Sequence, residues 1–368
     1  MPAAARDNSS LSTRCFERIL LIKPSSLGDV VHALPVLHGL RARYPDARIE
    51  WLIGSAFAQL VEGHPDVDEL VLFDRRRFAR VGRSFRVTAD FVRYLRQLRA
   101  RDYDLVIDLQ GLFRTGLFSY LTKAAVRIGP GDAREGACMF YTHRLGPFQP
   151  NEHAVDRNYA VAALLGFANV PVRFDLALPA EAVRSAQADL RGAGWLDRRP
   201  LLAVLPGTRW DTKRWPAERF AAVIDNLHDG SDAQCVLLGS PDEAELCERI
   251  AGQCRTEPMN LAGRTTLRGL AATIQLAEVV LAHDSAPMHL AVALERPLVC
   301  LMGPTNAHRT GPYRRFGDVV RLDLECAPCY LRKLTQCRFQ HRCMQELPVA
   351  TVLNAVARAR SGGSVSVS

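Results

Sequence analysis

The feature that most constrains this chain is an alternation of short apolar runs with helically spaced segments. Apolar runs at residues 19–22, 49–53, 69–73 and 105–109 are separated by segments with helical spacing or turn residues. Strands that alternate with helices at this interval form βαβ units around a parallel sheet, and their crossovers are right-handed. We therefore predict a doubly wound, Rossmann-like domain over residues 15–178.

A second alternation follows a more polar stretch at residues 168–200. Its apolar runs lie at residues 201–205, 234–238, 279–282 and 298–302, and they predict a second Rossmann-like domain over residues 179–345. Residues 346–360 are predicted to form a helix that packs back on the first domain. The predicted fold class is therefore α/β with GT-B architecture, in which two Rossmann-like domains face a cleft. Ligands of such sheets bind where strands end, so we searched the strand-to-helix turns.

Composition and charge limit the class of partner. No apolar run approaches the roughly 20 residues that span a bilayer, and the first 14 residues lack the apolar core of a secretory signal, so we expect a cytoplasmic protein. The formal charge is +8, and ten arginines lie between Arg75 and Arg101. This patch suits phosphates of a membrane or an anionic substrate, or it is a solvated helical face. No nucleic-acid-binding motif accompanies it, so no nucleic acid partner is expected.

The first turn that could form part of a functional site is KPSSLGD, directly after the first apolar run. Gly28 permits close approach of a ligand to the backbone, and Ser25 and Ser26 add hydroxyl donors beside a helix start that favours anions. Asp29 can accept a proton from an acceptor hydroxyl. The alternative is that Asp29 only caps the helix.

Two turns of the second domain suit a diphosphate. Thr208 follows the strand at residues 201–205, and Lys213 adds a cation that can neutralise a departing diphosphate. Asp284 and Ser285 open a helix after the strand at residues 279–282, and His289 lies one turn into it. Asp284 occupies the position expected of an N-cap, so structural capping is the alternative.

Together these motifs resemble glycosyltransferase family 9, the ADP-heptose:lipopolysaccharide heptosyltransferases, over nearly the whole chain. The segments that carry the resemblance are IKPSSLGDVVHALP, YDLVIDLQGLFRT, PGTRWDTKRWP, LAGRTTL and DSAPMHLA. Residues 134–136 and 153–158 are similar to segments of the first heptosyltransferase, which acts on the Kdo-lipid A inner core. One position departs from the family, because Ala286 stands where Gly is common; its methyl group should alter how closely the backbone meets a phosphate.

The resemblance implies an inverting transfer of L-glycero-D-manno-heptose from ADP-heptose to an anionic Kdo-lipid A acceptor, with no cofactor required. It implies a peripheral enzyme on the cytoplasmic face of the inner membrane, with Asp29 as catalytic base. Glu243 matches the acid on the donor ribose, and Thr265 aligns near the adenine pocket. The donor-binding set is Thr208, Lys213, Glu243, Thr265, Asp284, Ser285 and His289. The acceptor-binding set is Ser25, Ser26, Gly28, Arg134, Arg144 and Arg157.

Four of the ten cysteines cluster near the end of the chain: Cys326, Cys329, Cys337 and Cys343. A CxxC pair with two further thiols can hold a structural zinc or iron ion, although the second half lacks a close pair. Reduced thiols, or disulfides formed on oxidation, are the alternatives. In each case we expect a structural role.

Three other functions remain open at this point. A family 9 transferase can use another acceptor, either a later core heptose or a protein. A nucleotide-sugar 2-epimerase also uses two Rossmann-like domains, but it converts its substrate without an acceptor. A catalytically inactive binding module would have no need of both Asp29 and Lys213.

Overall fold

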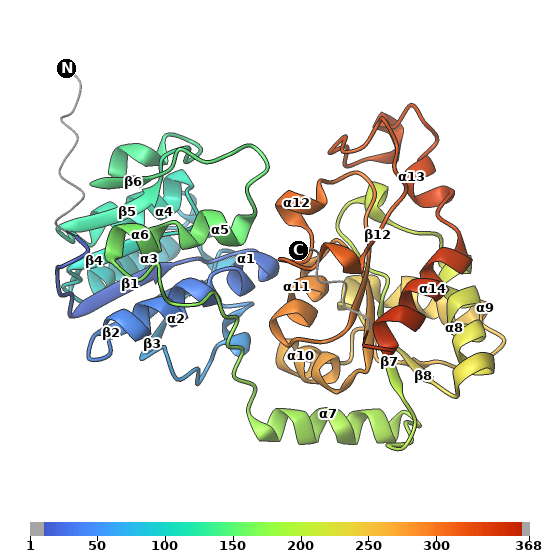
Figure 1. The fold of residues 1–368 in the computed structure, drawn as a ribbon. Coiled ribbons are helices and arrows are strands. Elements are labelled where there is room, and N and C mark those ends of the chain that lie inside the picture. The colour runs from blue at the N-terminus through green and yellow to red at the C-terminus, as the bar shows by residue number, and fades with distance from the viewer. Residues whose placement is uncertain (1–10, 363–368) are drawn as a thin grey trace. The chain divides into compact units, whose positions relative to one another are not determined.

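A computed structural model of the chain describes residues 11–362, which divide into two compact units between Ala177 and Leu178 (Figure 1). The N-terminal unit is built on a six-stranded sheet in the order β3-β2-β1-β4-β5-β6, in which all neighbours are parallel. Its strands are β1 (Arg18–Ile22), β2 (Arg48–Gly54), β3 (Glu69–Phe73), β4 (Leu105–Asp108), β5 (Val126–Pro130) and β6 (His143–Leu145). Its helices are α1 (Leu27–Val31), α2 (Leu34–Arg43), α3 (Phe85–Arg99), α4 (Phe113–Leu121), α5 (Ala154–Tyr159) and α6 (Val161–Leu165).

The C-terminal unit has a second six-stranded parallel sheet, in the order β12-β11-β10-β7-β8-β9. Its strands are β7 (Leu201–Leu205), β8 (Gln234–Leu237), β9 (Met259–Asn260), β10 (Val279–His283), β11 (Leu298–Leu301) and β12 (Val319–Val320). Its helices are α7 (Ala180–Gly192), α8 (Ala217–Ser231), α9 (Ala244–Gln253), α10 (Leu267–Leu276), α11 (Ala286–Ala293), α12 (Ala307–Thr310), α13 (Arg342–Gln345) and α14 (Val349–Arg360).

The two units share one connectivity. When each unit's strands are numbered from its own first strand, both sheets read 3-2-1-4-5-6, the order of a dinucleotide-binding Rossmann fold. The strand order reverses beside β1 and β4 in one unit and beside β7 and β10 in the other. This topology confirms the predicted α/β class with two Rossmann-like units. It also places the KPSSLGD turn after β1, and the PGT and DSAPMH turns after β7 and β10, at the switch points where ligands bind.

The central strands are buried on both faces, as parallel strands covered by helices must be. In the N-terminal unit, α3 and α4 cover one face with an aromatic cluster formed by Phe73, Phe78, Phe91, Tyr94 and Phe118. Burying such a set removes several hundred Å² of apolar surface from water, at roughly 25 cal/mol per Å². The cluster therefore fixes α3 on the sheet and leaves its arginine-rich side exposed.

The C-terminal helix contributes to the core of the second unit. Residues 346–360 were expected to form a helix, and they include α14, which packs on α8 and against β11 within the C-terminal unit. Its Val352, Ala355 and Val356 are buried in the core that also contains Leu202 and Val299. The apolar positions of a helix specify that one side is buried but not which partner buries it, and here the uncovered face of the second sheet provides the partner.

Candidate functional site

The KPSSLGD turn brings Asp29 to the carboxyl end of β1. The N-cap of α1 is Ser26, and Asp29 occupies the third helical position, where its Oδ2 accepts hydrogen bonds from the Ser26 backbone N–H (2.8 Å) and hydroxyl (2.7 Å). The side chain is 39% exposed. Asp29 therefore takes part in a capping box, as the alternative interpretation held, and it also keeps a carboxylate face open to solvent.

Lys23 is a candidate site residue that the sequence analysis missed. Its side chain is buried, and its Nζ donates to the Leu109 carbonyl at 2.6 Å and lies 3.7 Å from Asp29 Oδ1. The clue in the sequence was a lysine placed directly after an apolar strand, in a chain with only four lysines. Because its ammonium joins the β1 and β4 turns, Lys23 fixes the position of the Asp29 carboxylate.

The buried Asp108 side chain stabilises the turn that follows β4. Its carboxylate is fully buried and accepts hydrogen bonds from the Gln110 N–H (2.8 Å), the Gly111 N–H (3.2 Å) and the Tyr141 hydroxyl (2.7 Å). Burial raises the pKa of Asp108, and burial together with this carboxylate raises the pKa of Tyr141. The bonds shape the turn whose Leu109 carbonyl receives Lys23, so Asp108 supports the Asp29 site indirectly.

The three arginines predicted to bind the acceptor differ in whether a carboxylate of the protein already pairs with them. Arg134 and Arg144 are exposed, beyond β5 and on β6. Arg157 is half-buried, donates to Asp132 Oδ2 at 2.6 Å, and lies 4.2 Å from the centroid of the Phe148 ring. Arg134 and Arg144 are therefore better placed to meet an anionic ligand than Arg157.

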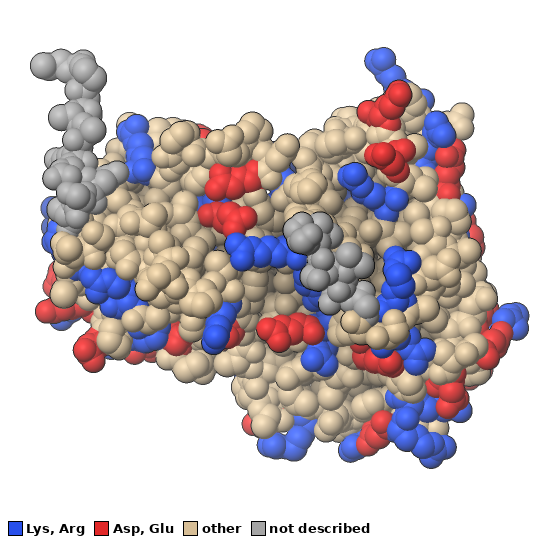
Figure 2. Space-filling view, viewed as in Figure 1, with Lys and Arg blue, Asp and Glu red and all other residues tan. Residues whose placement is uncertain are grey.

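Part of the Arg75–Arg101 patch is neutralised within the protein. Arg101 pairs with Glu50 and Glu69, which hold the pKa of its guanidinium above the ordinary value. Arg77 and Arg93 both pair with Asp90. The other seven arginines of the patch are exposed. On the face shown in Figure 2, basic and acidic side chains are interspersed over both units.

The donor turns of the C-terminal unit converge on one buried ion pair. Lys213 ends a one-turn 3-10 helix, Asp211–Lys213, and its Nζ donates to the Asp284 carboxylate at 2.7 Å and to the Asp284 carbonyl at 3.1 Å. The Asp284 carboxylate also accepts from the hydroxyls of Thr305 (2.5 Å) and Thr310 (3.5 Å). These contacts join the turns after β7, β10 and β11.

This arrangement changes the role expected for Asp284. The N-cap of α11 is Ser285, one residue later, and the Asp284 side chain is turned to Lys213 instead of the helix start. Ser285 is half-buried, and His289 is buried within α11. Asp284 thus holds the lysine in place, while the start of α11 remains the part of the turn that can face an anion.

Glu243 and Gly207 are brought into contact across the turns after β7 and β8. The Glu243 carboxylate accepts from the Ser240 N–H (2.8 Å) and hydroxyl (3.0 Å). It lies so close to Gly207 that a Cβ at that position would overlap its oxygens. Thr208 is buried beside this contact, whereas Thr265 is half-buried just before Thr266, the N-cap of α10. Only glycine at position 207 allows the carboxylate to lie there.

His283 is a structural histidine at the end of β10. Its imidazole is fully buried, and Nε2 accepts a hydrogen bond from the Trp215 N–H at 2.9 Å. Burial lowers the pKa of His283 to about 3, so the ring is neutral at physiological pH. A neutral ring is needed here, because the nitrogen that receives the Trp215 amide must keep its lone pair.

The four clustered cysteines are free thiols, with Cys329 exposed and the other three partly buried. Burial and the neighbouring thiols raise the pKa of Cys343 to about 11. Over residues 11–362, no three His, Cys, Asp or Glu side chains are arranged to hold a metal ion. The zinc or iron interpretation therefore gains no support from the geometry, while the reduced-thiol interpretation agrees with it.

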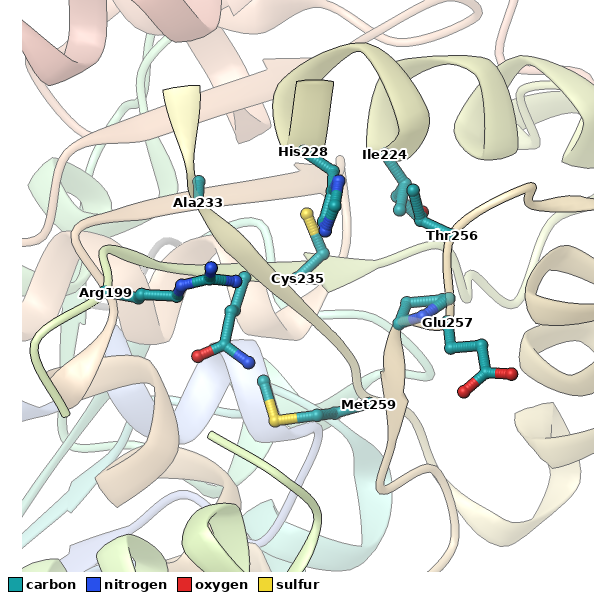
Figure 3. A pocket seen from close by; sticks show the side chains of 10 residues that line it. Arg199, Ile224, His228, Ala233, Cys235, Thr256, Glu257 and Met259 are labelled. Atoms are coloured by element: carbon teal, nitrogen blue, oxygen red, sulfur yellow. The ribbon is translucent and has the colours of Figure 1, made fainter. Parts of the chain in front are cut away.

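A separate small cavity of about 70 Å³ lies at the amino ends of β8 and β9 (Figure 3). It is lined by Arg199, His228, Gln234, Cys235 and Met259, among others. It is far smaller than the several hundred Å³ of a typical ligand pocket, and it lies away from the strand ends that carry the donor residues. We do not assign it to the site.

The predicted site residues thus form two groups. Asp29 and the acceptor residues lie in the N-terminal unit, and the seven donor residues lie in the C-terminal unit. Among the described residues, no helix is both long enough and apolar enough to cross a membrane.

Comparisons with known proteins identify the family of the chain. The model of "Glycosyltransferase family 9 (heptosyltransferase)" matches residues 91–340. Lipopolysaccharide heptosyltransferase 1 of Pseudomonas aeruginosa is 32% identical over 86% of this chain and 87% of its own.

Two solved structures extend the comparison to the fold. A family 9 glycosyltransferase from Veillonella parvula has a TM-score of 0.80 and 25% identity, covering 94% of this chain and 98% of its own. The E. coli heptosyltransferase WaaC with ADP-2-deoxy-2-fluoro heptose has a TM-score of 0.70 and 26% identity, covering 93% and 99%.

Proposed function

The chain belongs to glycosyltransferase family 9, and from this premise we propose that it transfers L-glycero-D-manno-heptose from ADP-heptose to the Kdo region of the lipopolysaccharide inner core. The single observation that carries the proposal is the resemblance to a heptosyltransferase 1 over 86% of the chain. The buried Lys213–Asp284 pair after β7 and β10 supports a diphosphate-bearing donor, because it fixes a cation among helix-start amides.

In the proposed reaction, an acceptor hydroxyl attacks the anomeric carbon of the heptose as the bond to the ADP oxygen breaks. Asp29 takes the hydroxyl proton, and ADP leaves with the electron pair of the broken bond. Lys213 and the amides at the start of α11 stabilise the negative charge that develops on the diphosphate. A single displacement of this kind inverts the anomeric configuration.

Thr208, Glu243, Thr265, Ser285 and His289 complete the proposed donor site. Glu243 is assigned to the ribose and Thr265 to the adenine end. On the acceptor side, the turn that carries Asp29 also contains Ser25, Ser26 and Gly28. Arg134 and Arg144 are assigned to anionic groups of the acceptor, with a smaller contribution from the already paired Arg157.

The decisive experiment measures ADP release from ADP-heptose with and without a Kdo-lipid A acceptor. Release that depends on this acceptor, with heptosylated lipid as product, is expected. Release with only a heptosylated core or a protein would assign a different family 9 acceptor. Conversion of the nucleotide sugar without any acceptor would indicate a 2-epimerase instead, and binding without turnover an inactive module.

The proposed acceptor is anchored in a membrane, and we place the enzyme peripherally on the cytoplasmic face of the inner membrane. The supporting observation is the outer side of α3, where Phe85 is 92% exposed among exposed arginines. Such a surface attracts anionic headgroups and can insert an apolar side chain. Sedimentation with anionic vesicles, but not with zwitterionic ones, is the expected result. Equal sedimentation with both, or with neither, would contradict this placement.

A further inference from the structure

Two of the three cations of the donor turn, Lys213 and Arg214, are compensated by carboxylates, and the third, Arg209, is exposed. Lys213 pairs with Asp284 at 2.7 Å, with the two side chains only 13% and 5% exposed, and Arg214 pairs with Asp211 at 3.0 Å. A nucleoside diphosphate carries more than one negative charge. Because Lys213 and Arg214 already face carboxylates, a further positive group from outside the turn would strengthen the binding of a diphosphate here.

The chain after β12 lies against this turn. Residues 326–343, here called the cysteine segment, carry all four clustered cysteines and run into α13 (Figure 1). The Thr212 hydroxyl donates to the Leu331 carbonyl at 2.5 Å, and Nε2 of the buried His341 lies 2.7 Å from the Thr212 carbonyl, to which it donates. Two bonds to one buried threonine thus tie the cysteine segment to the donor turn, next to Lys213.

Arg332, within the cysteine segment, shares an aromatic ring with Lys213. The Arg332 guanidinium carbon lies 4.8 Å from the centroid of the Trp210 indole, and Lys213 Nζ lies 4.6 Å from the same centroid. The two cations are therefore no farther apart than the sum of these distances. Within residues 11–362, Arg332 is exposed and no carboxylate lies within ion-pair distance of it.

We propose that Arg332 is a donor-binding residue, which the cysteine segment holds over Trp210 so that its guanidinium contacts the diphosphate of the nucleotide sugar. A guanidinium can donate two parallel hydrogen bonds to phosphate oxygens. Stacking on the indole restricts its rotamers before the ligand arrives, which lowers the entropy cost of binding. This proposal deepens the proposed function and rests on it, and it assigns the cysteine segment to support of the donor site.

The test compares Arg332→Ala with Arg338→Ala, which removes another exposed arginine of the same segment. Binding of ADP and of adenosine to the full chain is measured by titration calorimetry, with melting temperatures as a check on folding. We expect Arg332→Ala to raise the ADP dissociation constant about fivefold to tenfold, as for one lost charge-assisted hydrogen bond. Adenosine affinity and the melting temperature are expected to stay unchanged, and Arg338→Ala should behave as wild type.

Three results would overturn the proposal. An Arg332→Ala protein with wild-type ADP affinity would show that the guanidinium does not reach the diphosphate. An equal loss of ADP affinity in Arg338→Ala would indicate a general electrostatic effect of the segment's positive charge. An equal loss of adenosine affinity in Arg332→Ala would indicate that Arg332 only supports the structure of the turn. In each case wild-type ADP binding and acceptor-dependent transfer would persist, so the proposed function would stand. Wild-type protein that does not bind ADP would overturn both.

Discussion

Both units pair a lysine with an aspartate at the carboxyl ends of central strands, yet give the two carboxylates different environments. In the N-terminal unit, Lys23 lies 3.7 Å from Asp29, whose carboxylate is 39% exposed. In the C-terminal unit, Lys213 contacts Asp284 at 2.7 Å, and that carboxylate is 5% exposed and also accepts from two threonine hydroxyls. One carboxylate can meet an arriving hydroxyl, and the other is occupied with holding a lysine. The residue pair alone therefore does not define a role; its exposure and remaining contacts do.

The largest effect is expected when the exposed carboxylate loses its basicity. Asp29→Asn keeps the shape and an oxygen for the Ser26 bonds but cannot take a proton at neutral pH. Turnover should fall about 10²-fold or more, with ADP affinity little changed, as measured by steady-state rates and calorimetry. Near-normal turnover would reduce Asp29 to a member of a capping box and remove the contrast between the two carboxylates.

The next largest effects are expected on ligand binding, with donor affinity changed by a substitution in the C-terminal unit and acceptor affinity by one in the N-terminal unit. Lys213→Gln should weaken ADP binding by roughly tenfold or more, because a charge-assisted contact is lost and Asp284 is left buried without its cation. Arg134→Ala should chiefly raise the KM for the acceptor, by a smaller factor. Lys123→Gln, at an exposed lysine of the N-terminal unit, serves as control. Unchanged ADP affinity in Lys213→Gln would mean that the donor binds elsewhere.

Acidification should change the stability contributed by two buried groups, one in each unit, in opposite directions. The pKa of His283 is lowered to about 3 in the folded chain, so the stability tied to its neutral form is complete above the ordinary value of 6.5. That stability is lost as the pH falls from 6.5 toward 3, by on the order of a few kcal/mol. The pKa of Asp108 is raised instead, so protonation on acidification favours the folded N-terminal unit.

Hydrogen exchange measured separately at β10 and β4 between pH 7 and pH 5 can test this difference. Protection at β10 should fall more steeply than at β4, and His283→Gln should flatten the slope at β10 alone. Parallel slopes in both units of the wild type would argue against the assigned roles of the two buried groups.

The smallest effect is expected from metal removal. In the proposed donor site, Lys213 and the start of α11 would supply positive charge without a metal, and the four thiols are free. Treatment with a chelator should therefore leave the rate of transfer and the melting temperature within error of the untreated protein. A loss of activity restored by a divalent cation would assign charge neutralisation in the C-terminal unit to a metal. A loss of melting temperature alone would assign a structural ion to the cysteine segment.

The sequence by itself determined the two-unit α/β architecture and the turns that carry the site. These features follow from local rules: apolar runs of strand length, helical spacing between them, and ligand sites at the carboxyl ends of parallel strands. The motifs after β1, β7 and β10 could therefore be located, and the family that they resemble was confirmed. Arg134 and Arg144 could be named as acceptor-binding candidates from the sequence. The sequence could not show that they lie exposed while Arg157 is paired with Asp132.

Only the tertiary structure decided which side chains meet. Lys213 and Asp284 are 71 residues apart, Lys23 and Leu109 are 86 apart, and His341 contacts the turn at Thr212 from 129 residues away. For the same reason α14 could be predicted as a helix, but its packing on α8 and β11 could not. Spacing along a chain fixes which neighbours share a helix face or a strand end. Contacts between distant segments depend instead on how the sheets order their strands, and on which buried polar groups must find partners once water is excluded.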